Sequence, residues 1–124
     1  TTDPDVARLV GLLRAALSAA VAELAPRDRL RLTCYYAQDL TLAAIGRELK
    51  EHEATVSRHI ARTRREIRAN VDRRLGNEHG LDAAAIELCW RSAVADSADL
   101  DLGAIMGLSR KDPPEDRSKG QEGV

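Results

Sequence analysis

The 124-residue sequence contains no phenylalanine, and aromatic residues make up only 2% of it. A core with so few aromatics has to be built from leucine, isoleucine, valine and alanine, and the abundant alanine, leucine and arginine favour helices. No stretch approaches the roughly 20 apolar residues of a membrane-spanning helix. The polar N-terminal TTDPD does not have the character of a signal peptide. We therefore expect an all-α, cytoplasmic protein with a modest core and no membrane association.

Cysteine and histidine are also scarce, and their spacing does not indicate a metal site. Cys34 and Cys89 do not form a CxxC pair, and the three histidines are scattered. We expect both thiols to be buried in a reducing compartment, although a disulfide between them stays open at this level. Paired carboxylates, a nucleophile–base pair and a glycine-rich phosphate loop do not stand out, so we expect no enzymatic activity and no cofactor.

Net charge is nearly absent, at −1, but the two signs are separated along the chain. Residues 26–75 hold twelve basic and seven acidic residues, for +5, whereas residues 76–124 hold five basic and ten acidic residues, for −5. Five arginines fall within eleven positions, from Arg58 to Arg68. This separation suggests a polyanionic partner for the middle of the chain.

Apolar residues recur at spacings of three and four, which predicts a series of helices. The expected helices cover residues 5–24, 26–39, 41–49, 53–75 and 81–95. Pro26 suits a first helical turn, Thr41 can cap the third helix, and GNEHG at 76–80 has the composition of a linker.

The expected organisation has four parts. They are an N-terminal helix or linker to an upstream domain (1–25), a helix-turn-helix domain (26–75), an acidic helical extension (76–106) and a disordered tail (107–124).

The arginine-rich helix has two different faces on a wheel of 100° per residue. Its apolar stripe, within about 80°, contains Val56, Ile60, Thr63, Ile67 and Val71. The opposite face contains Ala54, Thr55, Arg58, Arg62 and Arg65, and its flanks are Ser57, Arg64 and Arg68. Short polar groups followed by guanidinium groups suit the major groove of DNA. A solvated charged face is the plainer alternative, but acidic partners at i+4 are scarce.

The preceding segment, LTLAAIGREL (40–49), predicts a helix that braces the arginine-rich helix in a helix-turn-helix. Gly46 leaves room for the close approach of the two helices. Tyr35 and Tyr36, at the end of the second helix, are expected in the core, with a polymerase contact as the alternative.

These elements together resemble region 4, the C-terminal promoter-reading domain of bacterial RNA polymerase sigma factors, most of all the extracytoplasmic-function type. The resemblance covers roughly residues 23–75 and is carried by L-x-P-R-x-R, YY, L-T-L-A-x-I-G and E-A-T-V-S-R in this order. It implies binding of double-stranded promoter DNA at the minus-35 element and docking on the β flap of the RNA polymerase core. It also implies a monomer outside the holoenzyme and an anti-sigma protein as a further partner.

The resemblance places part of the recognition surface on particular residues. Those expected near bases or adjacent phosphates are Glu53, Thr55, Ser57, Arg58 and Arg62, and those expected near the backbone are Thr41 and Lys50. Arg64, Arg65 and Arg68 are added from the wheel and the charge. The chain departs from the family in the turn, where Lys50, Glu51 and His52 replace glycine, an apolar residue and serine or threonine. It also lacks the aromatic-rich promoter-melting domain, so it is expected to read a promoter without opening it alone.

Two other functions stay open for the same residues. One is a response-regulator type of helix-turn-helix regulator, which would act as a homodimer on two half-sites. The other is a sigma-like protein-interaction module with little DNA affinity. For the acidic extension, we expect either a stabilising helix over 81–95 or a docked helix that holds DSADLD (96–101) where it tunes DNA access.

Overall fold

The computed structural model describes residues 4–95, which form five α-helices and one π-helical segment and contain no strand. The helices are α1 (Pro4–Ala22), α2 (Pro26–Leu32), α3 (Leu42–Leu49), α4 (Glu53–His79) and α5 (Ala83–Ala95). The π-helical segment, η1 (Thr33–Ala37), continues α2 directly, so the predicted second helix changes its hydrogen-bond pattern before it ends. The all-α prediction is confirmed.

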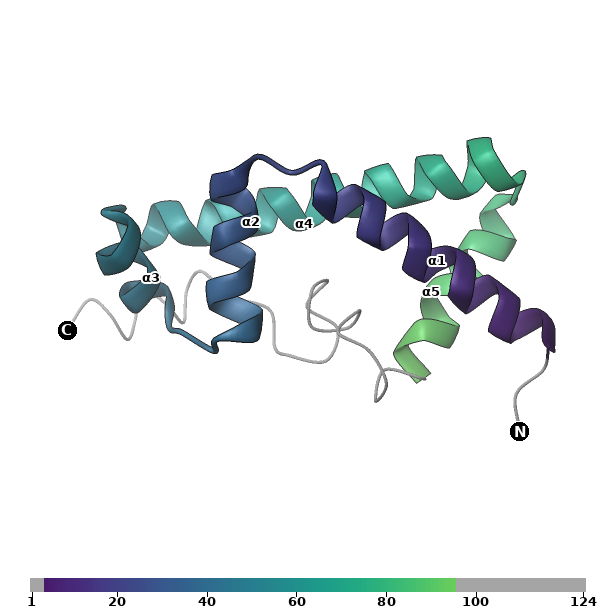
Figure 1. Ribbon diagram of the computed structural model, residues 1–124, viewed down its shortest axis with the longest axis horizontal. Coiled ribbons are helices and arrows are strands. Elements are labelled where there is room, and N and C mark those ends of the chain that lie inside the picture. The colour runs from purple at the N-terminus through teal and green to yellow at the C-terminus, as the bar shows by residue number, and fades with distance from the viewer. Residues whose placement is uncertain (1–3, 96–124) are drawn as a thin grey trace.

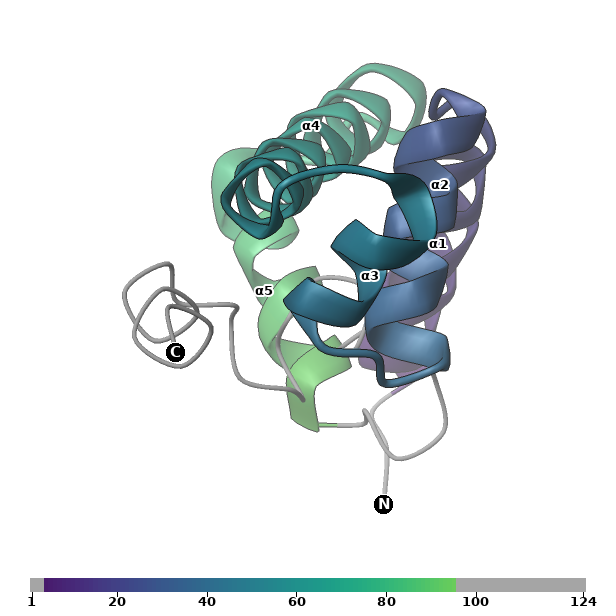
Figure 2. The same cartoon turned by 90° about the vertical axis from the view of Figure 1, so that its left-hand side faces the viewer.

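Helix α4 runs the length of the molecule, and the other helices pack along one side of it (Figure 1). Helices α2 and α3 lie against its N-terminal half, and α1 and α5 lie toward its C-terminal half. In the view along the molecule, α4 forms one edge, and no other helix covers its outer side (Figure 2). The predicted apolar stripe of α4 is buried as expected and extends one further turn to Leu75.

The two halves of α4 are covered by different parts of one apolar core. Near the N-terminal half, Leu42 and Ile45 of α3 pack with Tyr35, which is 2% exposed and meets Tyr36 edge-on with 4.8 Å between ring centroids. The core position expected for Tyr35 is confirmed. Near the C-terminal half, α1 contacts both α4 and α5. The buried residues of α1 and α5 are Leu9, Val10, Leu13, Ala16, Leu17, Ala20, Cys89, Trp90 and Ala93.

The predicted linker at 76–80 is wrong for residues 76–79, which continue α4. Gly76 lies within the helix, directly after the fully buried Leu75. The helix ends one turn later at Gly80, whose φ of 66° lies in the left-handed region that glycine adopts without strain. The Gly80 amide donates to the Gly76 carbonyl over 3.1 Å, and the Leu81 amide donates to the Leu75 carbonyl over 3.2 Å.

The helix expected over 81–95 begins at Ala83, where the Asp82 carboxylate accepts a hydrogen bond from the Ala85 amide over 2.9 Å. It packs on α1 and α4, which both expectations for it allow. The acidic DSADLD segment, the rest of the extension to 106 and the tail at 107–124 lie outside the described residues, as do residues 1–3.

Candidate nucleic-acid interface

Helices α3 and α4 form the predicted helix-turn-helix, and the cap of α3 is the one expected. The Thr41 hydroxyl accepts a hydrogen bond from the Ala44 amide over 3.0 Å, which satisfies a free donor of the first helical turn. The close approach predicted at Gly46 is also present. A Cβ at this position would lie 2.4 Å from the Glu51 carbonyl oxygen, so any larger residue would displace the turn.

The turn between α3 and α4 is formed by Lys50, Glu51 and His52, the three residues that depart from the family pattern. Lys50 adopts a left-handed conformation with φ of 58°, the geometry for which glycine is preferred. His52 takes the position of the cap, because its Nδ1 accepts a hydrogen bond from the Ala54 amide over 3.1 Å. The recognition helix therefore begins at Glu53, although serine or threonine is absent from the turn.

The third residue of the turn, Glu51, is held by two arginines of α2. Arg31 donates from Nε to Oε1 over 3.0 Å and from Nη2 to Oε2 over 2.5 Å, and its Nη1 donates to Asp28 over 2.6 Å. Arg27 donates from Nε to Glu51 Oε2 over 2.9 Å and also binds the Leu49 carbonyl. The Arg31 hydrogen bond, assisted by Arg27, lowers the pKa of Glu51 from 4.5 to about 2.

The outer side of α4 carries the predicted arginine face. Arg58, Arg62 and Arg65 are all exposed, and at 100° per residue they lie opposite the buried stripe of α4. Arg58 donates to the Thr55 hydroxyl over 3.2 Å, which places the two groups together near the start of the helix. Arg62 lies 3.6 Å from both Asp28 and Glu66, and among the described residues Arg65 has no ion pair. The predicted DNA contacts of these residues stay predictions.

Ser57 does not belong to this face. Its side chain is only 1% exposed and lies in the core beside the apolar stripe, so it is not presented at the surface where the contact with DNA was predicted. The wheel placed it on a flank, and packing of α3 and α2 against α4 covers that flank. Glu53, Thr55 and Arg64 are partly buried, while Thr41 and Lys50 are exposed.

Arg68 is partly exposed, and its guanidinium group contacts α5. Its guanidinium carbon lies 4.2 Å from the centroid of the Trp90 ring, and its nitrogens lie 3.4 Å from Asp72 and 3.9 Å from Glu87. Trp90 in turn donates from Nε1 to Asp72 over 2.9 Å. Arg68 therefore joins α4 to α5 through a cation–π contact and ion pairs, rather than presenting a free charge to phosphate.

The sequence analysis missed Arg73, which is exposed and lies eleven positions after Arg62. Eleven residues make about three helical turns, so the two arginines share a face. The signal was available, because Arg73 lies within the predicted helix over 53–75 and the same wheel places it close to Arg62.

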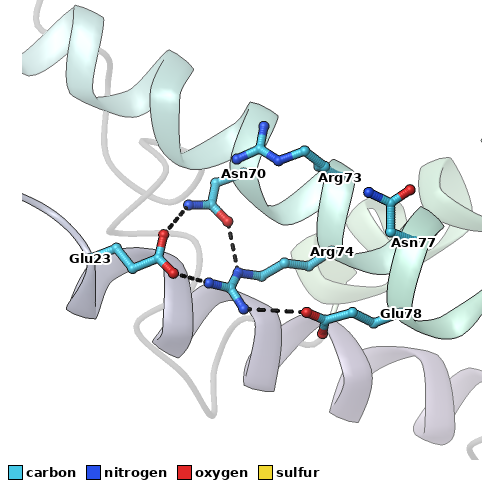
Figure 3. Close-up of a pocket in the computed structure, with 6 residues that line it drawn as sticks. All are labelled: Glu23, Asn70, Arg73, Arg74, Asn77 and Glu78. Carbon is cyan, nitrogen blue, oxygen red and sulfur yellow. Dashed lines mark hydrogen bonds and ion pairs between the residues drawn. The ribbon is translucent and has the colours of Figure 1, made fainter.

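A polar pocket of about 270 Å³ opens beside Arg73 between α1 and α4 (Figure 3). Arg74 binds Glu23, directly after α1, and lies 3.6 Å from Glu78, and Asn70 donates to Glu23 over 2.9 Å. Both carboxylates that line this pocket therefore contact Arg74. These contacts join the segment that follows α1 to α4.

Cys34 and Cys89 are both buried free thiols, as expected, and burial raises the pKa of each thiol. Within residues 4–95 there is no group of three or more His, Cys, Asp or Glu side chains that could hold a metal ion. No helix in that range is both long enough and apolar enough to cross a membrane.

Comparison with known families identifies part of this architecture. Residues 20–69 match the family model described as Sigma-70, region 4. No curated protein and no solved structure matches the chain. The matched segment contains the end of α1, all of α2 and α3, and the first 17 residues of α4 by the bounds of these elements. The family is not enzymatic, in agreement with the expectation from the sequence.

Proposed function

Because residues 20–69 match the sigma-70 region 4 family model, we propose that this chain recognises the minus-35 element of a promoter through the outer face of α4. The observation that carries the proposal is the row of exposed arginines, Arg58, Arg62 and Arg65, opposite the buried stripe of α4. An arginine fork can bind a guanine edge or a phosphate, and Thr55 adds a short polar group near the start of the helix. The exposed Lys50 and Thr41 flank this face and are assigned to the DNA backbone.

We further propose that the RNA polymerase core docks on a groove between α2, η1 and α3. The groove has a volume of about 810 Å³, and its lining includes Leu30, Leu40 and Leu49. Leu30 is the single exposed large apolar side chain among the described residues, at 43% exposure. The groove belongs to elements that stand behind α4 rather than on its outer face, so DNA and polymerase can bind together. The β flap is the expected ligand, and an anti-sigma protein would compete for the same groove.

The DNA part of the proposal is tested by selecting duplexes from a randomised pool and measuring affinity at several salt concentrations. We expect a selected duplex to be preferred, and Arg58→Ala to cost roughly 1–3 kcal/mol on it and to relax the preference at one position. Arg14→Ala, an exposed arginine on α1, is the matched control and should change neither quantity. Equal losses for selected and scrambled duplexes would refute the assignment of Arg58 to a base.

The same measurements separate the alternatives. A wild-type chain that sediments as a homodimer and selects two half-sites would favour a response-regulator type of regulator. A chain with no salt-dependent DNA affinity would favour a protein-interaction module. The extracytoplasmic-function subtype is part of our proposal, as are a monomeric state outside the holoenzyme and a cytoplasmic location.

A further inference from the structure

A buried arginine connects α2 to the turn that leads into α4. The Arg31 side chain is only 6% exposed, so it cannot reach a duplex that lies on the outer face of α4. Two of its nitrogens bind the two carboxylate oxygens of Glu51, and the third binds Asp28. Glu51 lies two residues before the start of α4 at Glu53. The ion pair therefore acts on the backbone that leads directly into the DNA-binding face.

The bidentate contact between Arg31 and Glu51 fixes the relative orientation of the two side chains as well as the distance between them. Two parallel hydrogen bonds between a guanidinium and a carboxylate restrict rotation in a way that an apolar contact does not. The turn is also held from the other side, because the Glu51 amide donates to the Gly46 carbonyl over 2.9 Å. With α3 on one side and α2 on the other, the turn has little freedom to move.

A second connection leads from Arg31 to the DNA-binding face. Asp28 binds Arg31 and also lies 3.6 Å from Arg62, an exposed arginine of that face. If Arg62 moves to a phosphate, Arg31 still neutralises Asp28, so the carboxylate is not left buried without a partner. Arg31 thus supports the position of Glu51 and the freedom of Arg62 at the same time.

Buried ion pairs are weak sources of stability, because the cost of removing two charges from water offsets much of their attraction. Their better-supported contribution is to specify one arrangement among several. We propose that Arg31 is a positioning residue for DNA recognition, which sets the orientation of the first turns of α4 through Glu51 and thereby determines base selectivity without touching DNA. This inference rests on the proposed function of the α4 face.

The test compares Arg31→Lys with the wild-type 124-residue chain. Lysine keeps the charge but replaces the two-pronged contact with a single point contact. We expect the ratio of affinities for selected and scrambled duplexes to fall on the order of tenfold, because small misplacements of recognition groups have large effects. Amide hydrogen exchange should accelerate at residues 54–58, at the start of α4, and stay unchanged in α1 and α5.

Arg29→Lys is the matched control, because Arg29 lies on the same helix but binds only the Ala22 and Leu24 carbonyls, at 3.2 and 3.3 Å. It should alter neither selectivity nor exchange at 54–58. Glu51→Gln removes the charge from the other partner and should change both readouts in the same direction. This second variant keeps the test decisive if Arg31→Lys does not fold.

The outcomes of this test are distinct. A selective wild-type chain whose selectivity and exchange survive both Arg31→Lys and Glu51→Gln would overturn the positioning role and leave the proposed function intact. Equal losses on both duplexes would also overturn it, because they indicate a smaller folded fraction rather than a misplaced helix. A wild-type chain that prefers no duplex would refute the proposed function, and the inference with it.

Discussion

Replacing Gly46 with alanine tests the close approach of α3 to the turn that leads into α4. The added Cβ would lie 2.4 Å from the Glu51 carbonyl oxygen, whereas ordinary contacts begin about 1 Å farther away. Neither side can yield easily, because one is a helix and the other is a turn held by Arg31. Overpacking of this kind costs roughly 1–3 kcal/mol, and we expect the upper end. The higher helix propensity of alanine returns about 1 kcal/mol, so the net loss should be about 2 kcal/mol.

Urea denaturation followed by circular dichroism measures this loss. Gly11→Ala is the matched control, because a Cβ on Gly11 of α1 would meet nothing within 4 Å. That exposed substitution should stabilise the protein by about 0.5–1 kcal/mol. If Gly46→Ala also stabilised the protein, the reasoning about the packed turn would be refuted. If it destabilised the protein by the same amount in a Glu51→Gln background, the turn would not depend on the ion pair for its rigidity.

Three further predictions concern the same region. Thr41→Ala should cost about 1 kcal/mol in urea denaturation because it removes the α3 cap, and an unchanged midpoint would contradict the cap. Lys50→Gly should stabilise the protein by about 0.5–1 kcal/mol by relieving its left-handed backbone, while weakening DNA affinity if Lys50 meets phosphate. The lowered pKa of Glu51, about 2 in place of 4.5, contributes roughly 3 kcal/mol that is fully present above pH 4.5 and is lost as the pH falls through 2. Acid titration of Glu51→Gln should lack that part of the loss, and superimposable acid profiles would contradict the ion pair.

The order of the helices and the place of the helix-turn-helix follow from local sequence patterns. The spacing of apolar residues predicts the buried stripe of a helix whatever packs against it. Pro26 and Thr41 mark the starts of α2 and α3 through local effects on the first helical turn. The arginine face of α4 was predictable for the same reason, since a side chain opposite a buried stripe faces outward. Composition was a poorer guide at 76–79, where four small or polar residues have the composition of a linker but continue α4.

Only the tertiary structure decided which of the α4 side chains that the wheel turns outward remain exposed and without a partner helix. The wheel places Arg68 on a flank of the arginine face, but only the fold shows that Trp90 of α5 contacts its guanidinium group, while Arg65 on the outer face stays exposed. Ser57 was lost from the surface because neighbouring helices bury that flank of α4. The bond between Arg31 and Glu51 joins residues twenty positions apart, and neither residue alone shows a reason to be buried. Hydrophobic periodicity predicts which face of its own helix a residue occupies. Exposure and ion pairing also depend on segments distant in the sequence, and these come into contact only when the core packs.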